Sequence, residues 1–342
     1  MTQNPWPDGT ATGIGSMPGT DPAEAARIVV GELPDLPSLP ELPGRGLGAD
    51  IIGRTAGLLV DLAVEEVTSG YRAASRAGRD HQRAVSALRA DLDAFDEAIE
   101  TAGVRPTVVK LQAAGPWTLA AGIELRTGHL ALTDPGALRE FTDSLAEGLA
   151  QHAAEVHRRT GATVVVQLDE PSLPAVLAGQ LPTPSGLGRV SAVAEADAQA
   201  GLRTVIDAVG GPVIVHCCAG PLPPIGLFRG AGAAAVAIDL TLVTGSSTAT
   251  LDEIGQAWEA GVVLLLGLVP SVDPPAPVTL REVARPAFDL ADRLGFPRDT
   301  LAGRVIPTPT CGLAGASTAW ATRALALSRD IGRAFVEPPE DW

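Results

Sequence analysis

The chain contains three cysteines, and each of them follows a run of apolar residues that is typical of a buried strand. Cys217 and Cys218 end one such run, and Cys311 follows another. His216 and Cys218 are two residues apart, so their side chains can point to the same side of an extended chain. One imidazole and two thiolates with an open fourth position are typical of a catalytic zinc ion. The sequence therefore predicts that His216, Cys218 and Cys311 bind one Zn²⁺, if the fold brings Cys311 to the other two.

A carboxylate is the fourth ligand that we expect, and Asp239 ends the next apolar run along the chain. Cys217 would point away from the metal, as a small buried hydrophobic residue. In the alternative interpretation all three cysteines are simply buried, because free cysteine is one of the residue types found most often in protein cores. The spacing of His216 and Cys218 favours the metal site over this alternative.

A pair of acids, Asp169 and Glu170, follows the predicted strand 163–168 and precedes Pro171. Proline favours an extended conformation for the residue before it, so the two acids should face opposite ways. One of them could then reach a pocket and bind a cationic group such as a substrate ammonium, while the other would pair with an arginine. The alternative is a turn in which both acids are solvated.

Two glycine-containing turns follow other predicted strands. Ile14, Gly15 and Ser16 offer backbone amides and a hydroxyl that suit a substrate carboxylate, although a tight turn alone also explains them. Trp117 could lie at the rim of a pocket, but a place in the core is the more common role of tryptophan. We expect His152 to lie on a solvated helix face together with His157.

The apolar segments alternate with amphipathic segments along the whole chain. Consecutive apolar positions favour parallel strands that are buried on both faces, and strand–helix alternation favours a parallel sheet with right-handed crossovers. We therefore predict a single (β/α)8 TIM-barrel domain over residues 1–342, with its active site at the C-terminal ends of the strands. The expected strands are 11–16, 107–112, 163–168, 212–216, 234–238, 262–267 and 304–308, with a proline-rich eighth within 36–52, such as 38–41. The expected helices are 21–32, 54–75, 80–102, 136–160, 190–209, 250–260, 279–294 and 317–335.

Composition narrows the classes of function. The chain has 342 residues, of which 46% are hydrophobic, and its net charge of −15 argues against a broad basic face for nucleic acid. No apolar run approaches the ~20 residues of a membrane span. Three cysteines, two of them adjacent, do not form a disulfide framework, and the N-terminus lacks a signal pattern, so we expect a cytoplasmic protein. Lys110 is the only lysine, which we interpret as genome composition.

The motifs together resemble the C-terminal catalytic barrel of cobalamin-independent methionine synthase. The resemblance extends over nearly the whole chain in the order of its motifs: residues 14–18 (IGSMP), 167–173 (QLDEPSL), 216–218 (HCC) and 311–313 (CGL). It implies a zinc-dependent S-methyltransferase that transfers a methyl group to homocysteine, giving methionine. By position in the motifs, it implies zinc ligands at His216, Cys218, Cys311 and Asp239, and substrate contacts from Ile14, Gly15, Ser16 and Asp169. Asp169 and Ser16 would be the catalytic residues.

The chain departs from the family at four places. Asp239 stands where the family has a glutamate ligand, and residues 267–273 lack the family's catalytic histidine. The family enzyme has an additional N-terminal barrel that helps to bind the folate donor, and its second amino-binding acid has only Glu41 as a candidate here. These departures bear on the methyl donor more than on the acceptor. Methyl-folate and a methyl-corrinoid protein both stay open as donors, as does a barrel that binds zinc or a thiol without catalysis.

Overall fold

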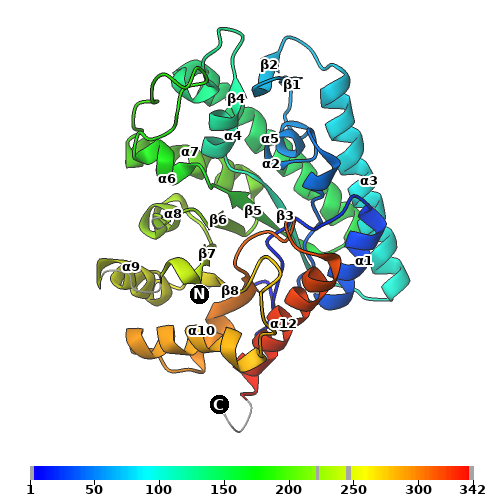
Figure 1. Ribbon diagram of the computed structural model, residues 1–342, viewed down its shortest axis with the longest axis vertical. Coiled ribbons are helices and arrows are strands. Elements are labelled where there is room, and N and C mark those ends of the chain that lie inside the picture. Colours follow the sequence, from blue (N-terminus) through cyan, green and yellow to red (C-terminus); the bar gives the residue numbers. More distant parts are fainter. Residues whose placement is uncertain (1–3, 221–222, 244–247, 339–342) are drawn as a thin grey trace.

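A computed structural model describes residues 4–220, 223–243 and 248–338 and shows an α/β fold. Its central sheet has six parallel strands in the order β3-β5-β6-β7-β8-β9, with helices packed around it (Figure 1). The strands are β3 Val108–Ala114, β5 Thr163–Asp169, β6 Val213–Cys217, β7 Ala235–Asp239, β8 Val263–Val269 and β9 Val305–Pro309. The prediction of these six strands and of their parallel order is confirmed.

The expected strands at 11–16 and 38–41 are not regular strands. They form only isolated bridges: Ser16 pairs with Glu41, which joins the two segments, and Ser38 pairs with Lys110 of β3. Segment 36–43 contains three prolines, which cannot donate ladder hydrogen bonds, so a continuous strand cannot form there. Hydrogen bonds still join both segments to the sheet. Thr12 N donates to Pro307 O of β9 at 3.3 Å, and Leu39 N donates to Lys110 O of β3 at 2.8 Å, so the sheet is curled.

Apart from segment 54–75, the longer helices lie close to the predicted ranges, and side-chain caps begin two of them. Asp134 accepts from the backbone amides of Gly136 and Ala137, and Ser317 accepts from that of Trp320. The longer helices are α1 Pro22–Glu32, α3 Arg79–Ala102, α5 Pro135–Thr160, α7 Glu195–Val209, α9 Thr248–Glu259, α10 Leu280–Leu294 and α12 Thr318–Val336. The short ones are α2 Ile51–Ala56, α4 Pro116–Gly122, α6 Leu173–Leu177, α8 Ile225–Ala231 and α11 Thr300–Arg304, with 3-10 turns η1 Pro43–Arg45, η2 Ala131–Thr133 and η3 Leu240–Leu242.

The predicted helix 54–75 is wrong. Only α2 forms at its start, and the rest is an antiparallel hairpin of β1 Ala63–Val67 and β2 Gly70–Ala74, seen at the upper end of Figure 1. Strand β4, Ile123–Glu124, pairs in parallel with β2. Gly70 has φ +129°, a conformation that favours glycine and turns the chain between the two strands. The predicted helix 190–209 begins only at Glu195.

The inner face of the sheet changes character along the strands. Every second side chain along a strand lies on the same face of the sheet. On β3 the apolar Val108 is followed on this face by Lys110 and Gln112, and on β5 Val165 is followed by Gln167 and Asp169. The apolar members form a closed cluster at the amino ends of the strands: Trp6, Leu36, Val108, Val165, Ile214, Ala235, Ala237, Val263, Leu265 and Ile306. The polar members follow toward the carboxyl ends, which is where a site must form.

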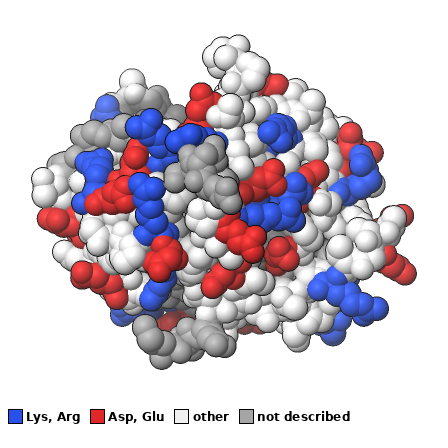
Figure 2. All heavy atoms as spheres, turned by 90° about the horizontal axis from the view of Figure 1, so that it is seen from below, with Lys and Arg blue, Asp and Glu red and all other residues white. Residues whose placement is uncertain are grey.

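Two further features of the described residues concern binding to nucleic acid and to membranes. Blue and red side chains are interspersed on the face in Figure 2, and its described residues form no broad basic area. Within the described ranges, no helix combines the length and the apolar character that crossing a membrane requires.

Replacing glycine by alanine should have opposite effects on the stability of the protein at Gly148 and at Gly31. A Cβ at Gly148 in α5 would overlap the carbonyl oxygen of Leu58, whereas a Cβ at Gly31 in α1 would meet no atom within 4 Å. Gly148→Ala should destabilise the protein by roughly 1–3 kcal/mol through overpacking. Gly31→Ala should stabilise it by up to about 1 kcal/mol through helix propensity. Chemical denaturation measures both, and a stabilising Gly148→Ala would contradict the packing described.

Candidate active site

Two thiols that are distant in the sequence meet at the carboxyl ends of the strands. Cys218 directly follows β6 and Cys311 follows β9, and their Sγ atoms are 3.0 Å apart. Two further strands separate β6 from β9 in the sheet, so the curvature of the sheet produces this contact. Cys217 is fully buried in the apolar core, as expected.

The two thiols share one proton. The hydrogen bond from Cys218 lowers the pKa of Cys311 to about 6, and the same contact together with burial raises the pKa of Cys218 well above its usual range. Near neutral pH this contact therefore favours a pair of one thiol and one thiolate, in which either sulfur can be the donor. A thiolate held ready in this way is a soft ligand and a nucleophile.

His216 is held by the acid on the neighbouring strand. The β5–β6 ladder places Asp169 opposite His216, and Nδ1 of the ring lies 2.7 Å from Oδ1 of Asp169. The other ring nitrogen, Nε2, is buried and has no hydrogen-bond partner. A ring whose Nδ1–H is bound by a carboxylate presents the lone pair of Nε2, as metal-binding histidines commonly do.

The donor set suits zinc, although the described residues contain no preassembled group of three or more His, Cys, Asp or Glu side chains. Zn–S distances of about 2.3 Å in a tetrahedral site place two sulfurs about 3.8 Å apart. The Sγ atoms of Cys218 and Cys311 are closer than this, at 3.0 Å, so a small separation of the two side chains would admit the ion. The unpartnered Nε2 of His216 would be the third donor.

Asp239, the expected fourth ligand, ends β7 and begins the 3-10 turn η3. Its Oδ1 accepts from N of Thr241 at 2.8 Å and from Oγ1 of Thr241 at 2.7 Å. The carboxylate thus stabilises its own turn, and its role as a ligand stays a prediction.

The turn of Ile14, Gly15 and Ser16 lies against the loop that carries Cys311. Leu313 N donates to Ser16 O at 2.8 Å, and a Cβ at Gly312 would overlap Oγ of Ser16, so only glycine permits this approach. Gly15 has φ +152°, and a Cβ there would lie 2.7 Å from Cγ of Gln112. The structure therefore brings the predicted substrate-binding turn and the two thiols to one place.

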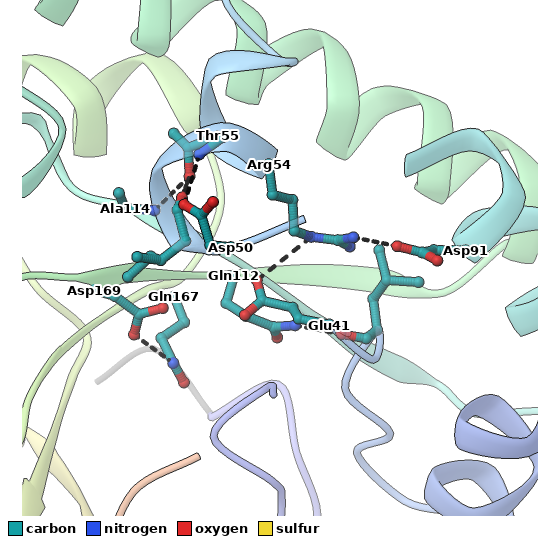
Figure 3. A network of polar contacts seen from close by, with 12 residues as sticks. Glu41, Asp50, Arg54, Thr55, Asp91, Gln112, Ala114, Gln167 and Asp169 are labelled. Carbon is teal, nitrogen blue, oxygen red and sulfur yellow. Dashed lines mark hydrogen bonds and ion pairs between the residues drawn. The ribbon is translucent and has the colours of Figure 1, made fainter. Parts of the chain in front are cut away.

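Glu41 is a second acid in this region, which the sequence indicated only as a candidate. It is buried, and Figure 3 shows it on the side of Arg54 opposite Asp91. Burial raises the pKa of Glu41 to about 7; the charge of Arg54 opposes this shift, and the negative charge of Asp169 adds to it. A buried carboxyl group beside a second carboxylate forms a natural receptor for a cation.

Sequence reasoning missed the buried cations of this region. Nε of Arg54 lies 3.4 Å from Oε1 of Glu41, and the same guanidinium binds Asp91 of α3, which also receives Arg45 at 2.8 Å. Lys110 is buried on the inner face of β3. A lone lysine inside an apolar strand was the available signal for Lys110, whereas no pattern marked Arg54.

Glu170 does not pair with an arginine and is not solvated, so both interpretations of its role were wrong. It is fully buried and accepts from N of Trp117 at 3.0 Å, and from N and Oγ1 of Thr118 at 2.8 and 2.7 Å. These amides are the free N–H groups at the start of α4, which attract a carboxylate. The acid that faces His216 is Asp169, whose Oδ1 also accepts from Nε2 of Gln167 at 2.7 Å (Figure 3).

Two other predictions concern aromatic residues. Trp117 lies in the core, where its Nε1 donates to Ala198 O at 2.9 Å. The prediction of a solvated His152 is wrong, because α5 packs this residue inward and burial lowers its pKa to about 3. His157, on the same helix, is exposed as expected.

The carboxyl end of β8 is where the resemblance leads one to expect a catalytic histidine. Asp273 is the only acidic or basic side chain in residues 267–273. It accepts from N and Oγ of Ser317 at 2.7 and 2.5 Å, and these bonds lower its pKa. Asp273 is therefore held as an acceptor at the start of α12.

The burial of Glu170 predicts a pH effect on stability. Burial raises the pKa of Glu170 to about 7 from an ordinary 4.5, although its three donors oppose the shift. Between these values the folded protein binds a proton that the unfolded chain has released, so this contribution to stability falls as the pH rises from 4.5 to 7. Glu170→Gln removes it, and the stability difference between wild type and variant should change by up to about 1.4 kcal/mol per pH unit. Parallel pH curves from urea denaturation would contradict this assignment.

Comparisons with known proteins agree with the predicted family. The model of the family "Cobalamin-independent synthase, Catalytic domain" matches residues 9–334. A B12-independent methionine synthase from Shewanella sp. W3-18-1, in complex with selenomethionine, has a TM-score of 0.58 and 12% identity over 96% of this chain and 98% of that chain. A methyltransferase from Methanosarcina mazei has a TM-score of 0.56 and 16% identity over 96% of this chain and 94% of that chain.

No curated protein matches the chain. At such identities the two structures show a shared fold, while the family model covers almost every described element from the turn before Ile14 to α12. The chain belongs to the family of the cobalamin-independent synthase catalytic domain.

Proposed function

We propose that the protein is a zinc-dependent S-methyltransferase whose acceptor is homocysteine or a related amino-acid thiol. The observation that carries this proposal is the contact between Cys218 and Cys311, near a histidine whose Nε2 is buried and unpartnered.

We further propose that the chain is one (β/α)8 domain in which segments 11–16 and 36–42 occupy the places of the first two strands. Free cysteine ligands require a reducing compartment, and we place the protein in the cytoplasm.

His216, Cys218 and Cys311 would hold the metal. A substrate thiol has a pKa near 8.5, and a bound zinc ion supplies the acidity that makes it a thiolate at neutral pH. Asp169 keeps Nδ1 of His216 engaged, so the ring offers only Nε2 to the site. With Cys218 and Cys311 as ligands, the substrate sulfur would lie at the carboxyl ends of β6 and β9.

The amino-acid part of the substrate would lie between the two buried acids and the glycine turn. Asp169 and Glu41 would bind the ammonium group, whose positive charge would offset the burial and the charge of Asp169, which raise the pKa of Glu41. The hydroxyl of Ser16 and the amides of the turn from Ile14 to Ser16 would bind the carboxylate. These contacts orient the sulfur toward the two cysteines.

Metal content tests the ligand assignment with a matched control on adjacent residues. We expect about one zinc ion per purified chain, lost in Cys218→Ala and in Cys311→Ala because each removes a thiolate. Cys217→Ala should keep the metal, because Cys217 lies in the apolar core. Zinc analysis measures all four proteins, and X-ray absorption should show a new Zn–S bond on addition of homocysteine. Wild-type protein that binds no zinc would refute the proposal.

A second candidate concerns the donor and is favoured by Asp273. A methyl-folate leaving group needs a proton, and the only acid in residues 267–273 is held as an acceptor with a lowered pKa. The leaving group of a methyl-corrinoid needs no proton from the protein. The arrangement at β8 therefore favours a methyl-corrinoid protein as the donor.

Methionine formation from homocysteine separates the two donors. We expect turnover with methylcobalamin, and at least about 100-fold less with methyltetrahydrofolate, since general acid catalysis commonly contributes that much. Cys218→Ala should be inactive with both. Comparable turnover with the folate would overturn the corrinoid assignment, and homocysteine binding without transfer from either donor would indicate a non-catalytic barrel.

A further inference from the structure

We propose that Lys110 is a positioning residue: acting through Gln167, it fixes the carboxylate of Asp169 and thereby the tautomer of His216. The inference rests on the proposed function only in that His216 is taken as a metal ligand. It concerns the only lysine of the chain, which lies on the inner face of β3, below the site.

Lys110 is completely buried, with 0% of its surface exposed. Its Nζ donates to Ile14 O at 2.9 Å, to Oε1 of Gln112 at 3.0 Å and to Oε1 of Gln167 at 2.8 Å. An ammonium group has three protons, so these acceptors use all of them. Burial lowers the pKa of Lys110 to about 8, while the charges of Asp169 and Glu41 oppose the shift, so the group is mostly cationic at neutral pH.

The ammonium determines which way the amide of Gln167 points. Because an ammonium only donates, it selects the oxygen of the amide and turns the NH₂ end away. That end donates to Ile14 O at 2.9 Å and to Oδ1 of Asp169 at 2.7 Å. A flipped amide would direct NH₂ at the ammonium and the oxygen at two acceptors.

The amide in turn holds the carboxylate that faces the histidine. Oδ1 of Asp169 receives Gln167 on one side and lies 2.7 Å from Nδ1 of His216 on the other. A carboxylate only accepts, so Nδ1 carries the proton and Nε2 keeps its lone pair. The order of contacts is Lys110, Gln167, Asp169 and His216, from β3 across β5 to β6. Loss of the ammonium would let the amide turn its oxygen toward Oδ1 of Asp169. The repulsion between the two oxygens would turn the carboxylate away from Nδ1, and the ring could then adopt the other tautomer.

Gln112 offers a matched control for this chain of contacts. Its Oε1 accepts from Lys110 as that of Gln167 does, and it is also buried, but its Nε2 donates to Leu39 O and not to Asp169. Gln112→Leu and Gln167→Leu therefore remove equivalent partners of Lys110, and only the second breaks the connection to His216.

The decisive measurement is the tautomer of His216 in metal-free protein, from long-range ¹H–¹⁵N spectra of histidine-labelled samples assigned with His216→Ala. We expect the wild type and Gln112→Leu to show protonated Nδ1, and Lys110→Met and Gln167→Leu to show a mixture or the other tautomer. Zinc affinity should fall roughly 10- to 100-fold in these two variants. The double variant should bind zinc no more weakly than either single one, since both act along one path.

An unchanged tautomer with zinc affinity within about twofold of wild type in Lys110→Met would overturn the proposal, whatever the loss of thermal stability. Should Lys110→Met fail to fold, Gln167→Leu decides by the same criterion. Labelled lysine adds a check that needs no assignment, because its single side-chain signal belongs to Lys110 and should shift in Gln167→Leu. The tautomer requires neither metal nor methyl donor, so it tests this inference even if zinc binding or methyl transfer fails.

Discussion

The hydrogen bond between Asp169 and His216 is the interaction on which the rest of the site depends. It joins β5 to β6 at the carboxyl ends of both strands, and it commits the carboxylate to the pocket and the imidazole to one orientation. Since Asp169 faces inward, alternation along an extended chain directs Glu170 outward, where it binds the amides at the start of α4. Two adjacent acids thus serve the site and the scaffold separately.

Charge compensation is the second constraint on the interior. Four ionisable groups, Glu41, Lys110, Arg54 and Asp91, are buried beside or below Asp169, and unpaired charges at such positions would strongly oppose folding. Arg54 contacts both Glu41 and Asp91, and Lys110 lies within electrostatic range of Glu41 and Asp169. The two acids beside the pocket can therefore stay buried without a bound substrate, and the site is organised before a ligand arrives.

The corrections share one physical origin. Residues 63–74 form a hairpin although their composition suggested a helix, because the turn at Gly70 and the pairing of β1 with β2 outweigh helix propensity. His152 is buried because α5 packs this face inward, where sequence alone suggested solvent. The irregular segments 11–16 and 36–43 keep their places through a few hydrogen bonds to β9 and β3. In each case contacts between distant segments overrode a local preference.

The sequence by itself determined the six parallel strands, most helices, the family and the residue types at the strand ends. It could do so because periodicity and ligand chemistry are local properties of a chain. Only the tertiary structure decided that Cys218 meets Cys311, that Asp169 and not Glu170 faces His216, and that Lys110 is fully buried under the site. The first contact depends on the curvature of the sheet, which brings residues 93 positions apart together, and the second depends on the pairing of β5 with β6. Composition alone showed only that Lys110 is the single lysine, whereas the structure shows that its ammonium group donates to three acceptors.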